Sequence, residues 1–252
     1  MIEFIDVNYR VCEYAILTEI NLKIYRGECI LLVGESGSGK TTLTKLVNGL
    51  IPHFYSSGQL DGEVNVNGEM VAETSMYKLA EMIGSVFQNP KSQFFYTDSS
   101  AEIAFGLENR GVPLEKIRQR IEATANELGI KNLLGRNIFK LSGGEKQIIA
   151  FASAYAEEPE IYVLDEPYSN LDNISAGRLK ELLLYIKAQG KTVIIAEHRL
   201  NYLSSVIDRA VYLKGGRIMQ EFTAAQFRAL TERERISMGL CTIKETQITI
   251  PE

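Results

Sequence analysis

The stretch CILLVGESGSGKTT, residues 29–42, decides the fold that we expect for this chain. Its first five residues, Cys29 to Val33, form a continuous apolar run typical of a parallel strand that is buried on both faces. The next eight, Gly34 to Thr41, fit the pattern G-x-x-x-x-G-K-[ST], in which backbone N–H groups surround a phosphate. A buried strand that ends in such a loop predicts an α/β fold with a phosphate-binding loop.

Two side chains of this loop carry its specific chemistry. Lys40 would neutralise oxygens of the β and γ phosphates, and the Thr41 hydroxyl would ligate Mg²⁺. The chain has no N-K-x-D motif, which reads guanine, so ATP is favoured over GTP. The residues expected to bind ATP here are Gly34, Glu35, Ser36, Gly37, Ser38, Gly39, Lys40, Thr41 and Thr42.

A second segment able to bind an anion lies far downstream and reads Leu141-Ser142-Gly143-Gly144-Glu145. Its two glycines would leave backbone N–H groups uncovered at the start of a helix, where the helix dipole also favours negative charge. One ATP per chain does not require two such segments. We therefore expect Ser142, Gly143 and Gly144 to contact, in trans, a nucleotide held by another copy.

An acidic pair follows the apolar run Ile161 to Leu164, which reads as another buried strand. Adjacent residues at a strand end point to different sides, so Asp165 and Glu166 can have different roles. We expect Asp165 to hold Mg²⁺, directly or through water, and Glu166 to polarise the attacking water.

These motifs, in this order, resemble those of the ATP-binding cassette (ABC) ATPases, and the likeness runs from about Tyr9 to about Ile218. Shorter segments look like those of the energy-coupling factor importers of vitamins and metals. They are residues 51–55 (IPHFY), 86–90 (VFQNP), 102–108 (EIAFGLE) and 197–200 (EHRL). The resemblance implies an enzyme that hydrolyses ATP to ADP and phosphate with Mg²⁺.

The resemblance also implies roles for single residues. Gln88 matches the Q-loop glutamine, whose amide would reach Mg²⁺ or the attacking water. His198 matches the switch histidine, which would contact the γ-phosphate and orient water. Tyr9 occupies the position where the family stacks an aromatic ring on adenine, with Tyr14 close by. Residues 169–172 resemble the D-loop, which lies along the dimer interface in the family.

Composition and charge narrow the class of protein. With 252 residues, 45% hydrophobic and 23% charged, the chain is an ordinary globular protein that can hold one cassette but not two. A net charge of −5 disfavours nucleic acid as a partner. No apolar run approaches the roughly 18 residues needed to cross a bilayer, and the start does not resemble a secretory signal. Cys12, Cys29 and Cys241 form no C-x-x-C pair, which indicates neither zinc nor disulfides.

Periodicity along the chain predicts the remaining organisation. Alternating patterns at 2–8, 20–25 and 64–67 predict a small antiparallel sheet, and the apolar runs at 29–33, 161–164, 193–196 and 210–213 predict the central parallel sheet. A helical pattern begins after Pro90, where Ser99 and Glu102 form a capping-box signature, and it ends near Pro159. Another helix is expected from Ala224 to Met238.

We therefore expect an α/β fold with a P-loop NTPase (RecA-like) core, an antiparallel β subdomain and an inserted helical subdomain. The ABC ATPase cassette would span residues 1–220, with the helical subdomain at about 90–159, and residues 221–252 would form a C-terminal helical extension and tail. The segment from Pro90 to Gly111 holds Phe94, Phe95, Tyr96, Phe105, Glu102 and Glu108. Such a mixture would receive a partner helix with apolar and basic residues.

The resemblance implies the ATPase subunit of an importer of a small solute, of the vitamin or transition-metal class, at the cytoplasmic face of the membrane. It would pair with a second ABC ATPase chain, identical or paralogous, and with transmembrane subunits. The alternatives are a conventional ABC importer ATPase for another small solute and a non-transport ABC ATPase acting on ribosomes or DNA. The sequence does not name the solute.

Overall fold

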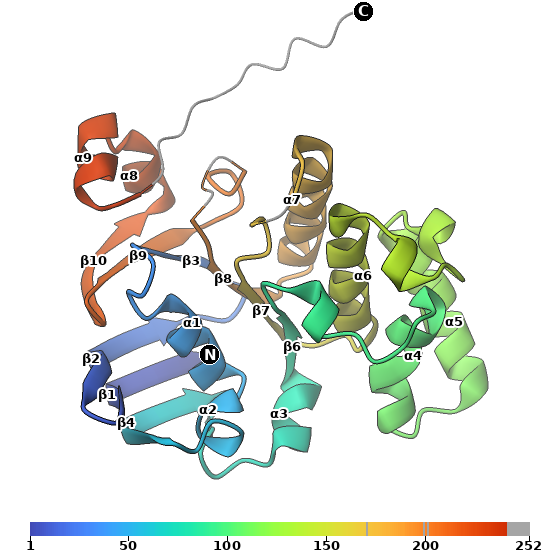
Figure 1. Ribbon diagram of the computed structural model, residues 1–252, viewed down its shortest axis with the longest axis horizontal. Helices are drawn as coiled ribbons and strands as arrows, with labels where there is room; N and C mark the ends of the chain where they lie inside the picture. Colours follow the sequence, from blue (N-terminus) through green and yellow to red (C-terminus); the bar gives the residue numbers. More distant parts are fainter. Residues whose placement is uncertain (170, 199, 201, 241–252) are drawn as a thin grey trace, which may run out of the picture.

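The computed structural model describes residues 1–169, 171–198, 200 and 202–240, which form two sheets with helices around them (Figure 1). The larger sheet has six strands in the order β10-β9-β3-β8-β7-β6. Strands β9, β3, β8, β7 and β6 run parallel, and β10 is antiparallel to β9. In the order of the sheet, the strands are β10 (Arg217–Thr223), β9 (Arg209–Lys214), β3 (Cys29–Val33), β8 (Thr192–Ala196), β7 (Ile161–Asp165) and β6 (Ile83–Val86). The four apolar runs expected in a parallel sheet are confirmed as β3, β7, β8 and β9.

The continuous apolar sequence of β3 follows from its position in the middle of this sheet. Leu31 and Val33 pack into one hydrophobic cluster, and Ile30 and Leu32 pack into a second. Successive side chains of a strand point to opposite faces, so a strand covered on both sides needs apolar residues throughout. The two clusters place the core on both faces of the sheet.

Two strands of the larger sheet were not expected from the sequence. Strand β6 has four residues, and its Gly84 leaves room for Pro159, whose Cγ would lie 2.8 Å from a Cβ at position 84. Strand β10 lies at the edge of the sheet and is mostly exposed. Neither a short strand with a glycine nor a polar edge strand gives a clear periodic signal.

The smaller sheet is antiparallel, as expected, with strand order β2-β1-β4-β5. Its strands are β2 (Tyr14–Ile24), β1 (Ile2–Val11), β4 (Gly58–Val66) and β5 (Glu69–Met70). A tight turn joins β1 and β2, and Val11 pairs with Tyr14 directly before and after this turn. One face of the sheet packs into the second hydrophobic cluster, which also contains Leu43 and Leu46 of helix α1. The sheet therefore covers α1.

The helices fall into two groups. Helices α1 (Lys40–Val47), α2 (Leu50–His53), α3 (Met76–Met82) and α7 (Asn173–Ala188) lie next to the two sheets. The segment expected to be helical contains α4 (Ser99–Asn109), α5 (Leu114–Glu127) and α6 (Gly143–Ala156), with short 3₁₀ turns at Pro90–Ser92, Lys131–Leu133 and Ile138–Lys140. These three helices form a lobe at one end of the molecule (Figure 1).

The expected capping box at Ser99 and Glu102 is wrong. Asp98 caps α4, because its carboxylate accepts hydrogen bonds from the backbone N–H groups of Ser100 and Ala101. The Ser99 hydroxyl is buried and donates to the carbonyl of Leu133. Asp98 and Ser99 are both common capping residues, so the sequence alone placed the cap one residue too late.

The C-terminal part also differs from expectation. Instead of one helix from Ala224 to Met238, there are two short helices, α8 (Ala224–Ala229) and α9 (Glu232–Ser237). Leu230 has a non-helical ψ of 128°, and Thr231 starts a new helix with its own capping box. Cys241 and the expected tail lie outside the described residues. No helix in the described ranges is long and apolar enough to span a membrane.

Candidate functional site

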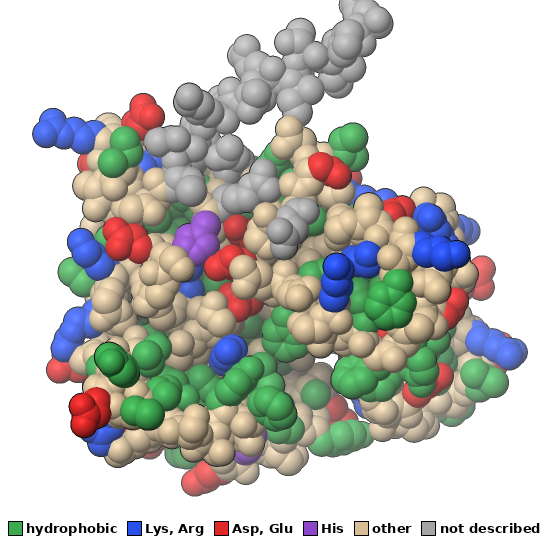
Figure 2. All heavy atoms as spheres, viewed as in Figure 1, with side chains coloured by type: hydrophobic (Ala, Val, Ile, Leu, Met, Phe, Trp, Pro, Cys, Tyr) green, Lys and Arg blue, Asp and Glu red, His purple; other side chains and the backbone are tan. Residues whose placement is uncertain are grey.

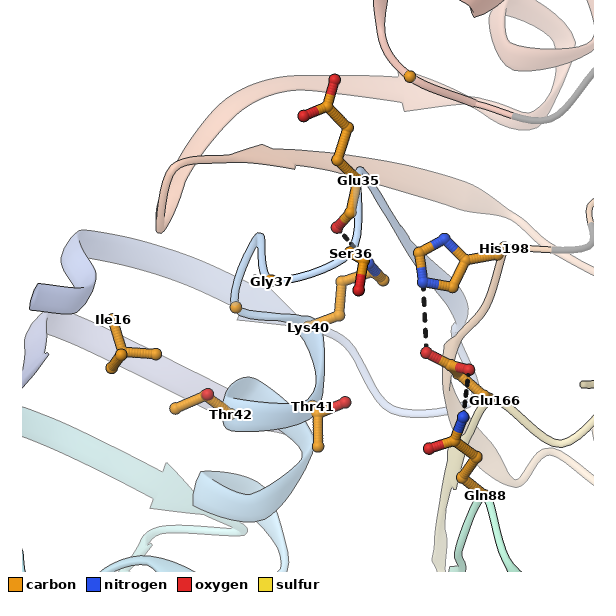
Figure 3. Close-up of a pocket in the computed structure, with 12 residues that line it drawn as sticks. Ile16, Glu35, Ser36, Gly37, Lys40, Thr41, Thr42, Gln88, Glu166 and His198 are labelled. Atoms are coloured by element: carbon orange, nitrogen blue, oxygen red, sulfur yellow. Dashed lines mark hydrogen bonds and ion pairs between the residues drawn. The ribbon is translucent and has the colours of Figure 1, made fainter. Parts of the chain in front are cut away.

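A cavity of about 780 Å³ opens where β3 ends, above the first turn of α1 (Figure 3). The loop from Gly34 to Gly39 forms one wall, and residues after β6, β7 and β8 form the other. The carboxyl ends of parallel strands are where open α/β folds place their ligands. The lining consists of Ile16, Glu35, Ser36, Gly37, Gly39, Lys40, Thr41, Thr42, Gln88, Glu166, His198 and Gly239.

Glycines allow the loop to pass close to its neighbours. A Cβ at Gly34 would lie 2.2 Å from the carbonyl oxygen of Leu213, and one at Gly39 would lie 2.6 Å from Cδ2 of Leu17. Both glycines have positive φ angles, 149° and 103°. Larger residues at these positions would displace the loop and misplace its N–H groups.

Lys40 lies inside the loop. Its side chain is buried, and its Nζ donates to the carbonyls of Gly34 at 2.9 Å and Glu35 at 2.8 Å and to the Ser38 hydroxyl at 3.3 Å. Burial lowers the pKa of Lys40, while carboxylates that include Glu166 oppose the shift. The loop thus holds an ammonium group at its centre, where a phosphate wrapped by the loop would lie.

Thr41 and Asp165 bring two oxygen ligands together. The Thr41 hydroxyl donates to Oδ1 of Asp165 at 3.0 Å. Burial raises the pKa of Asp165, and the hydrogen bond from Thr41 opposes that shift. A hydroxyl and a carboxylate are hard oxygen donors suited to Mg²⁺, which typically takes only one or two carboxylates besides phosphate oxygens and water. Within the described ranges there is no group of three or more His, Cys, Asp or Glu side chains that could hold a metal.

Glu166 lies between two other side chains at the end of the cavity (Figure 3). Its Oε2 accepts a hydrogen bond from Nε2 of Gln88 at 2.7 Å, and its Oε1 lies 3.2 Å from Nε2 of His198. The neighbouring Asp165 turns instead to Thr41, so the two adjacent carboxylates have separate partners, as expected. The structure brings Gln88, Glu166 and His198 together from three different strand ends.

The protonation of His198 follows from its surroundings. Burial and the Lys40 ammonium lower the pKa of His198, and the carboxylate of Glu166 opposes the shift. The imidazole is therefore neutral at pH 7, and its Nε2–H can donate to Glu166. Glu197 holds this segment in place, because Oε1 accepts from the His198 N–H at 2.9 Å and Oε2 from the Tyr168 N–H at 3.0 Å. The sequence analysis gave Glu197 no role. Its position directly before His198 was the only feature of the sequence that could have indicated one.

The Glu166 backbone is also unusual. Its φ is 44°, a left-handed conformation that a non-glycine residue rarely adopts, and its N–H donates to the carbonyl of Ala196 at 2.8 Å. Such strain is concentrated at functional sites, where the surrounding structure imposes it. The neighbouring strand thus fixes the direction in which this carboxylate points.

Tyr9 does not reach the cavity, so its expected contact with adenine is corrected. Only 5% of Tyr9 is exposed, and it packs in the second hydrophobic cluster. A Cβ at Gly58 would lie 2.3 Å from its hydroxyl oxygen, so Gly58 covers the ring. The cavity wall on that side is Ile16 of β2, a residue that sequence reasoning missed. The irregular register of β1 and β2 disturbs the alternation that would have identified it.

The segment with Ser142, Gly143 and Gly144 does not line this cavity. Helix α6 starts at Gly143, as predicted, and Ser142 caps it through a capping box with Glu145, which the sequence analysis did not predict. Gly144 has to be a glycine, since a Cβ there would lie 1.9 Å from Oγ of Ser175. The helix start therefore packs on α7, and Gly143 lines a second cavity, of about 490 Å³, that Gln88 also lines. Asn170, within the expected D-loop, lies outside the described residues.

The sequence profile of the ABC transporter family matches residues 17–169. The chain belongs to this family. The expected ABC ATPase domain is therefore confirmed, and the family to which it belongs consists of ATP-hydrolysing cassettes. The confirmed fold is the mixed α/β cassette with one antiparallel and one mainly parallel sheet.

Several known proteins are similar to this cassette over most of its length. An ABC transporter ATP-binding protein of Treponema denticola is 51% identical over 224 residues, 89% of this chain and 46% of that protein. One of Methanosarcina acetivorans is 37% identical over 248 residues, 98% of this chain and 40% of that protein. The chain thus spans about half the length of the curated relatives it matches.

Solved structures are similar as well. The structure of cbiO1 from Clostridium perfringens, part of the ABC transporter complex cbiONQ, has a TM-score of 0.81 and 29% identity, covering 94% of this chain and 92% of that one. A dimeric ATP-binding cassette in a post-hydrolysis state, bound to ADP and Pi, has a TM-score of 0.76 and 25% identity. That match covers 89% of this chain and 99% of the other.

Proposed function

We propose that this cassette energises the import of a small solute, of the vitamin or transition-metal class, through separate membrane subunits. The observation that carries this proposal is the likeness to cbiO1, part of a transporter complex, over 94% of the chain. The energy-coupling factor resemblance of residues 51–55, 86–90, 102–108 and 197–200 supports it independently. The cassette would work at the cytoplasmic face of the membrane.

In the proposed hydrolysis, the loop from Gly34 to Thr42 binds the phosphates and Lys40 neutralises the β and γ oxygens. Glu166 then accepts a proton from the water that attacks the γ-phosphorus. Gln88 and His198 support this role, because both donate to the carboxylate and hold it in one orientation. ADP and phosphate are the products.

Mg²⁺ would be held by Thr41 and Asp165, with Gln88 as a further oxygen ligand. When bound, the ion neutralises charge on the β and γ oxygens. The Thr41 hydroxyl donates to Asp165, so the two groups that would hold the ion lie side by side. Both side chains are already in contact, so the site needs little rearrangement.

A second ATPase chain, identical or paralogous, would complete each site. Ser142, Gly143 and Gly144 form a capped helix start that does not line the cavity of their own chain, and this supports binding in trans. Two ATP molecules would then lie between the chains and hold them together. Loss of the γ-phosphate would release the contact and open the pair.

The membrane partner would dock near α4. Phe95 is 73% exposed and stacks on Phe105 at 4.3 Å between ring centroids, and Tyr96 is 41% exposed. The Tyr96 hydroxyl donates to Glu108 at 3.3 Å. Figure 2 shows hydrophobic side chains gathered over the lower part of the molecule, where α2 and α4 lie. An aromatic surface with an acidic edge would receive a helix with apolar and basic residues.

Glu102 cannot take part in this docking, which corrects the expectation for it. It is only 2% exposed, and its Oε2 accepts hydrogen bonds from the backbone N–H groups of Phe95 at 2.9 Å and Tyr96 at 2.8 Å. The carboxylate therefore shapes the docking surface from below. Glu108 supplies the exposed acidic group.

Purification of the full chain from detergent-solubilised membranes tests the proposal. Co-purification with a transmembrane scaffold and a separate solute-capturing membrane protein would support it. A complex in which the solute arrives through another kind of subunit would favour a conventional importer. Sedimentation with ribosomes or DNA instead of membranes would overturn the transport proposal and leave the ATPase assignment intact.

A further inference from the structure

We propose that the C-terminal helices α8 and α9 belong to the ATP site, because the turn after them, at Gly239, holds the phosphate-binding loop in position through Glu35. Gly239 is then a positioning residue, which acts on the loop and not on the reacting atoms. This inference rests on the proposed function, in which the cavity binds ATP. It concerns a segment that lies outside residues 17–169, which the family profile matches.

Gly239 and Glu35 are in close contact, although they lie far apart in the sequence. A Cβ at Gly239 would lie 2.2 Å from Cγ of Glu35 and 2.6 Å from its Oε1, so the contact needs a glycine. Both residues line the cavity that contains Lys40. The Glu35 side chain points away from Gln88 and Glu166 (Figure 3). The contact is therefore on the side of the loop remote from the catalytic groups.

Contacts on two sides fix Glu35, the second residue of the loop. Inside the loop, its carbonyl accepts hydrogen bonds from Nζ of Lys40 at 2.8 Å and from the N–H of Ser38 at 3.2 Å. On the other side, its side chain meets Gly239. A loop of this kind binds phosphate through backbone N–H groups, whose directions depend on the path of the backbone. Contacts that fix Glu35 therefore fix the N–H groups beside it.

The C-terminal helices are attached firmly enough to act as a support, and they lie next to β9 and β10 (Figure 1). The N–H of Ala224, at the start of α8, donates to the carbonyl of Asp208 at 2.9 Å. Phe227 and Leu240 are buried in the first hydrophobic cluster. Arg235 of α9 is buried as well, and its guanidinium donates to the carbonyl of Phe227 at 2.7 Å. These contacts hold α8, α9 and the turn after them in one place on the core.

Gly239 also has a local role, which the test has to separate from the support of the loop. It ends α9 with a φ of 66°, its N–H donates to the carbonyl of Ile236 at 3.0 Å, and the N–H of Leu240 donates to that of Arg235 at 2.9 Å. Gly129 ends α5 in the same way, with a φ of 63° and the corresponding pair of hydrogen bonds. A Cβ there would meet no other described residue within 4 Å, so Gly129 is the matched control.

Alanine substitutions at these two glycines of the full chain test the support. Gly239→Ala should weaken the binding of Mg-ATP by about twofold to tenfold, the contribution of one hydrogen bond. It should weaken the binding of inorganic tripolyphosphate by the same factor, because the loop holds the phosphates of both. Gly129→Ala should bind both probes as the parent protein does. Both variants should melt at slightly lower temperatures, since alanine is strained at a positive φ in either place.

A Glu35→Ala background shows whether the effect passes through Glu35. This substitution removes the atoms that lie nearest to a Cβ at position 239. Adding Gly239→Ala to it should therefore leave the affinity of Glu35→Ala for both probes unchanged. Steady-state kinetics give a further readout. Gly239→Ala alone should raise the KM for ATP and keep kcat, because Gln88, Glu166 and His198 are not touched.

Equal affinities of Gly239→Ala and the parent protein for ATP and tripolyphosphate would overturn the inference alone. So would a loss that persists in the Glu35→Ala background, because the substitution would then act on the ligand or on α9 directly. A loss confined to ATP would do the same, since the loop is common to both probes. Failure of the parent protein to bind ATP would instead overturn the proposed binding on which the inference rests, so the two failures are distinguishable.

Discussion

Glu166 is constrained through both its backbone and its side chain. The left-handed φ of 44° sets its direction, and contacts with Gln88 and His198 hold its carboxylate. A general base needs a fixed position, and these contacts supply it for the role that we propose. Its removal is therefore the most direct test of the proposed hydrolysis.

We expect Glu166→Gln to keep ATP binding and to slow hydrolysis by about 10²–10⁴-fold, the usual contribution of a positioned acid or base. The amide keeps the shape of the side chain and can still accept from His198, but it cannot take a proton. Steady-state phosphate release measures the rate, and size exclusion with ATP should show an accumulated dimer. Near-normal turnover would remove Glu166 from the role of base.

Glu157 gives a prediction about pH and stability. Its carboxylate packs against Gly106, where a Cβ would lie 2.1 Å from its Oε1. Burial raises the pKa of Glu157 above its ordinary 4.5, and Arg110 opposes the shift. The folded protein thus binds this proton more tightly than the unfolded chain. The stabilisation is complete below the unfolded pKa and is lost as pH rises through the folded pKa.

We therefore expect Glu157→Gln to raise the melting temperature at pH 7 and to change it little below pH 4.5. The neighbouring Glu158, whose side chain is 68% exposed, provides the control, and Glu158→Gln should have similar small effects at both pH values. Calorimetry at the two pH values checks the difference. A Glu157→Gln protein no more stable than the parent at pH 7 would contradict the account.

At the scale of elements, α4 presents two glutamates with opposite roles. Glu102 and Glu108 are six positions apart on one helix, yet Glu102 is buried under the proposed docking surface and Glu108 is exposed at its edge. Charge and spacing do not distinguish them. The difference comes from the backbone N–H groups of residues 95 and 96, which donate to Glu102 and keep its carboxylate inside the protein. A partner could therefore reach only Glu108 of these two.

We expect Glu108→Lys to keep the melting temperature and ATP binding of the isolated chain while weakening assembly with the membrane partner. Glu102→Lys should lower the melting temperature by several degrees, because each unsatisfied N–H group costs about 1–3 kcal/mol. Thermal melts and co-purification from membranes separate the two effects. Normal assembly of Glu108→Lys would place the docking surface elsewhere.

Elements also show what the sequence could predict. Strands β3, β7, β8 and β9 were predictable, because burial on both faces leaves an apolar run in the sequence. The start of α6 was predictable because two adjacent glycines mark it in the local sequence. Tyr9 and Glu102 were misplaced because their burial depends on Gly58 and on residues 95–96, which are contacts that periodicity does not record.

At the scale of the whole molecule, the two segments that we propose to bind phosphate line different cavities. The cavity contains Lys40, whereas the Ser142 segment caps α6 in the helical lobe and packs on α7. A single chain could bind ATP through the cavity with Lys40 and would leave its Ser142 segment without a nucleotide. In the proposed arrangement in trans, each complete ATP site therefore needs residues from two chains.

Complementation tests that arrangement. The Ser142→Arg variant should bind ATP but not hydrolyse it, because the bulky side chain blocks the partner's nucleotide. The Lys40→Ala variant should bind ATP at least tenfold more weakly, since a charge-assisted hydrogen bond is worth about 1.5–3 kcal/mol. A mixture of the two variants should regain hydrolysis, since one site then combines an intact Lys40 with an intact Ser142. A phosphate-release assay measures the recovery. A mixture as inactive as its components would argue against shared sites.

The strained backbone at Glu166 has a consequence for how such cassettes evolve. A left-handed residue other than glycine costs roughly 1–2 kcal/mol, so a mutation to glycine at position 166 would relieve the cost while deleting the base. Loss of activity and gain of stability would come from the same substitution. In a pair of paralogous chains where one working site is sufficient for transport, mutational drift would therefore favour the decay of the other. Selection on hydrolysis, not on folding, is what keeps a glutamate here.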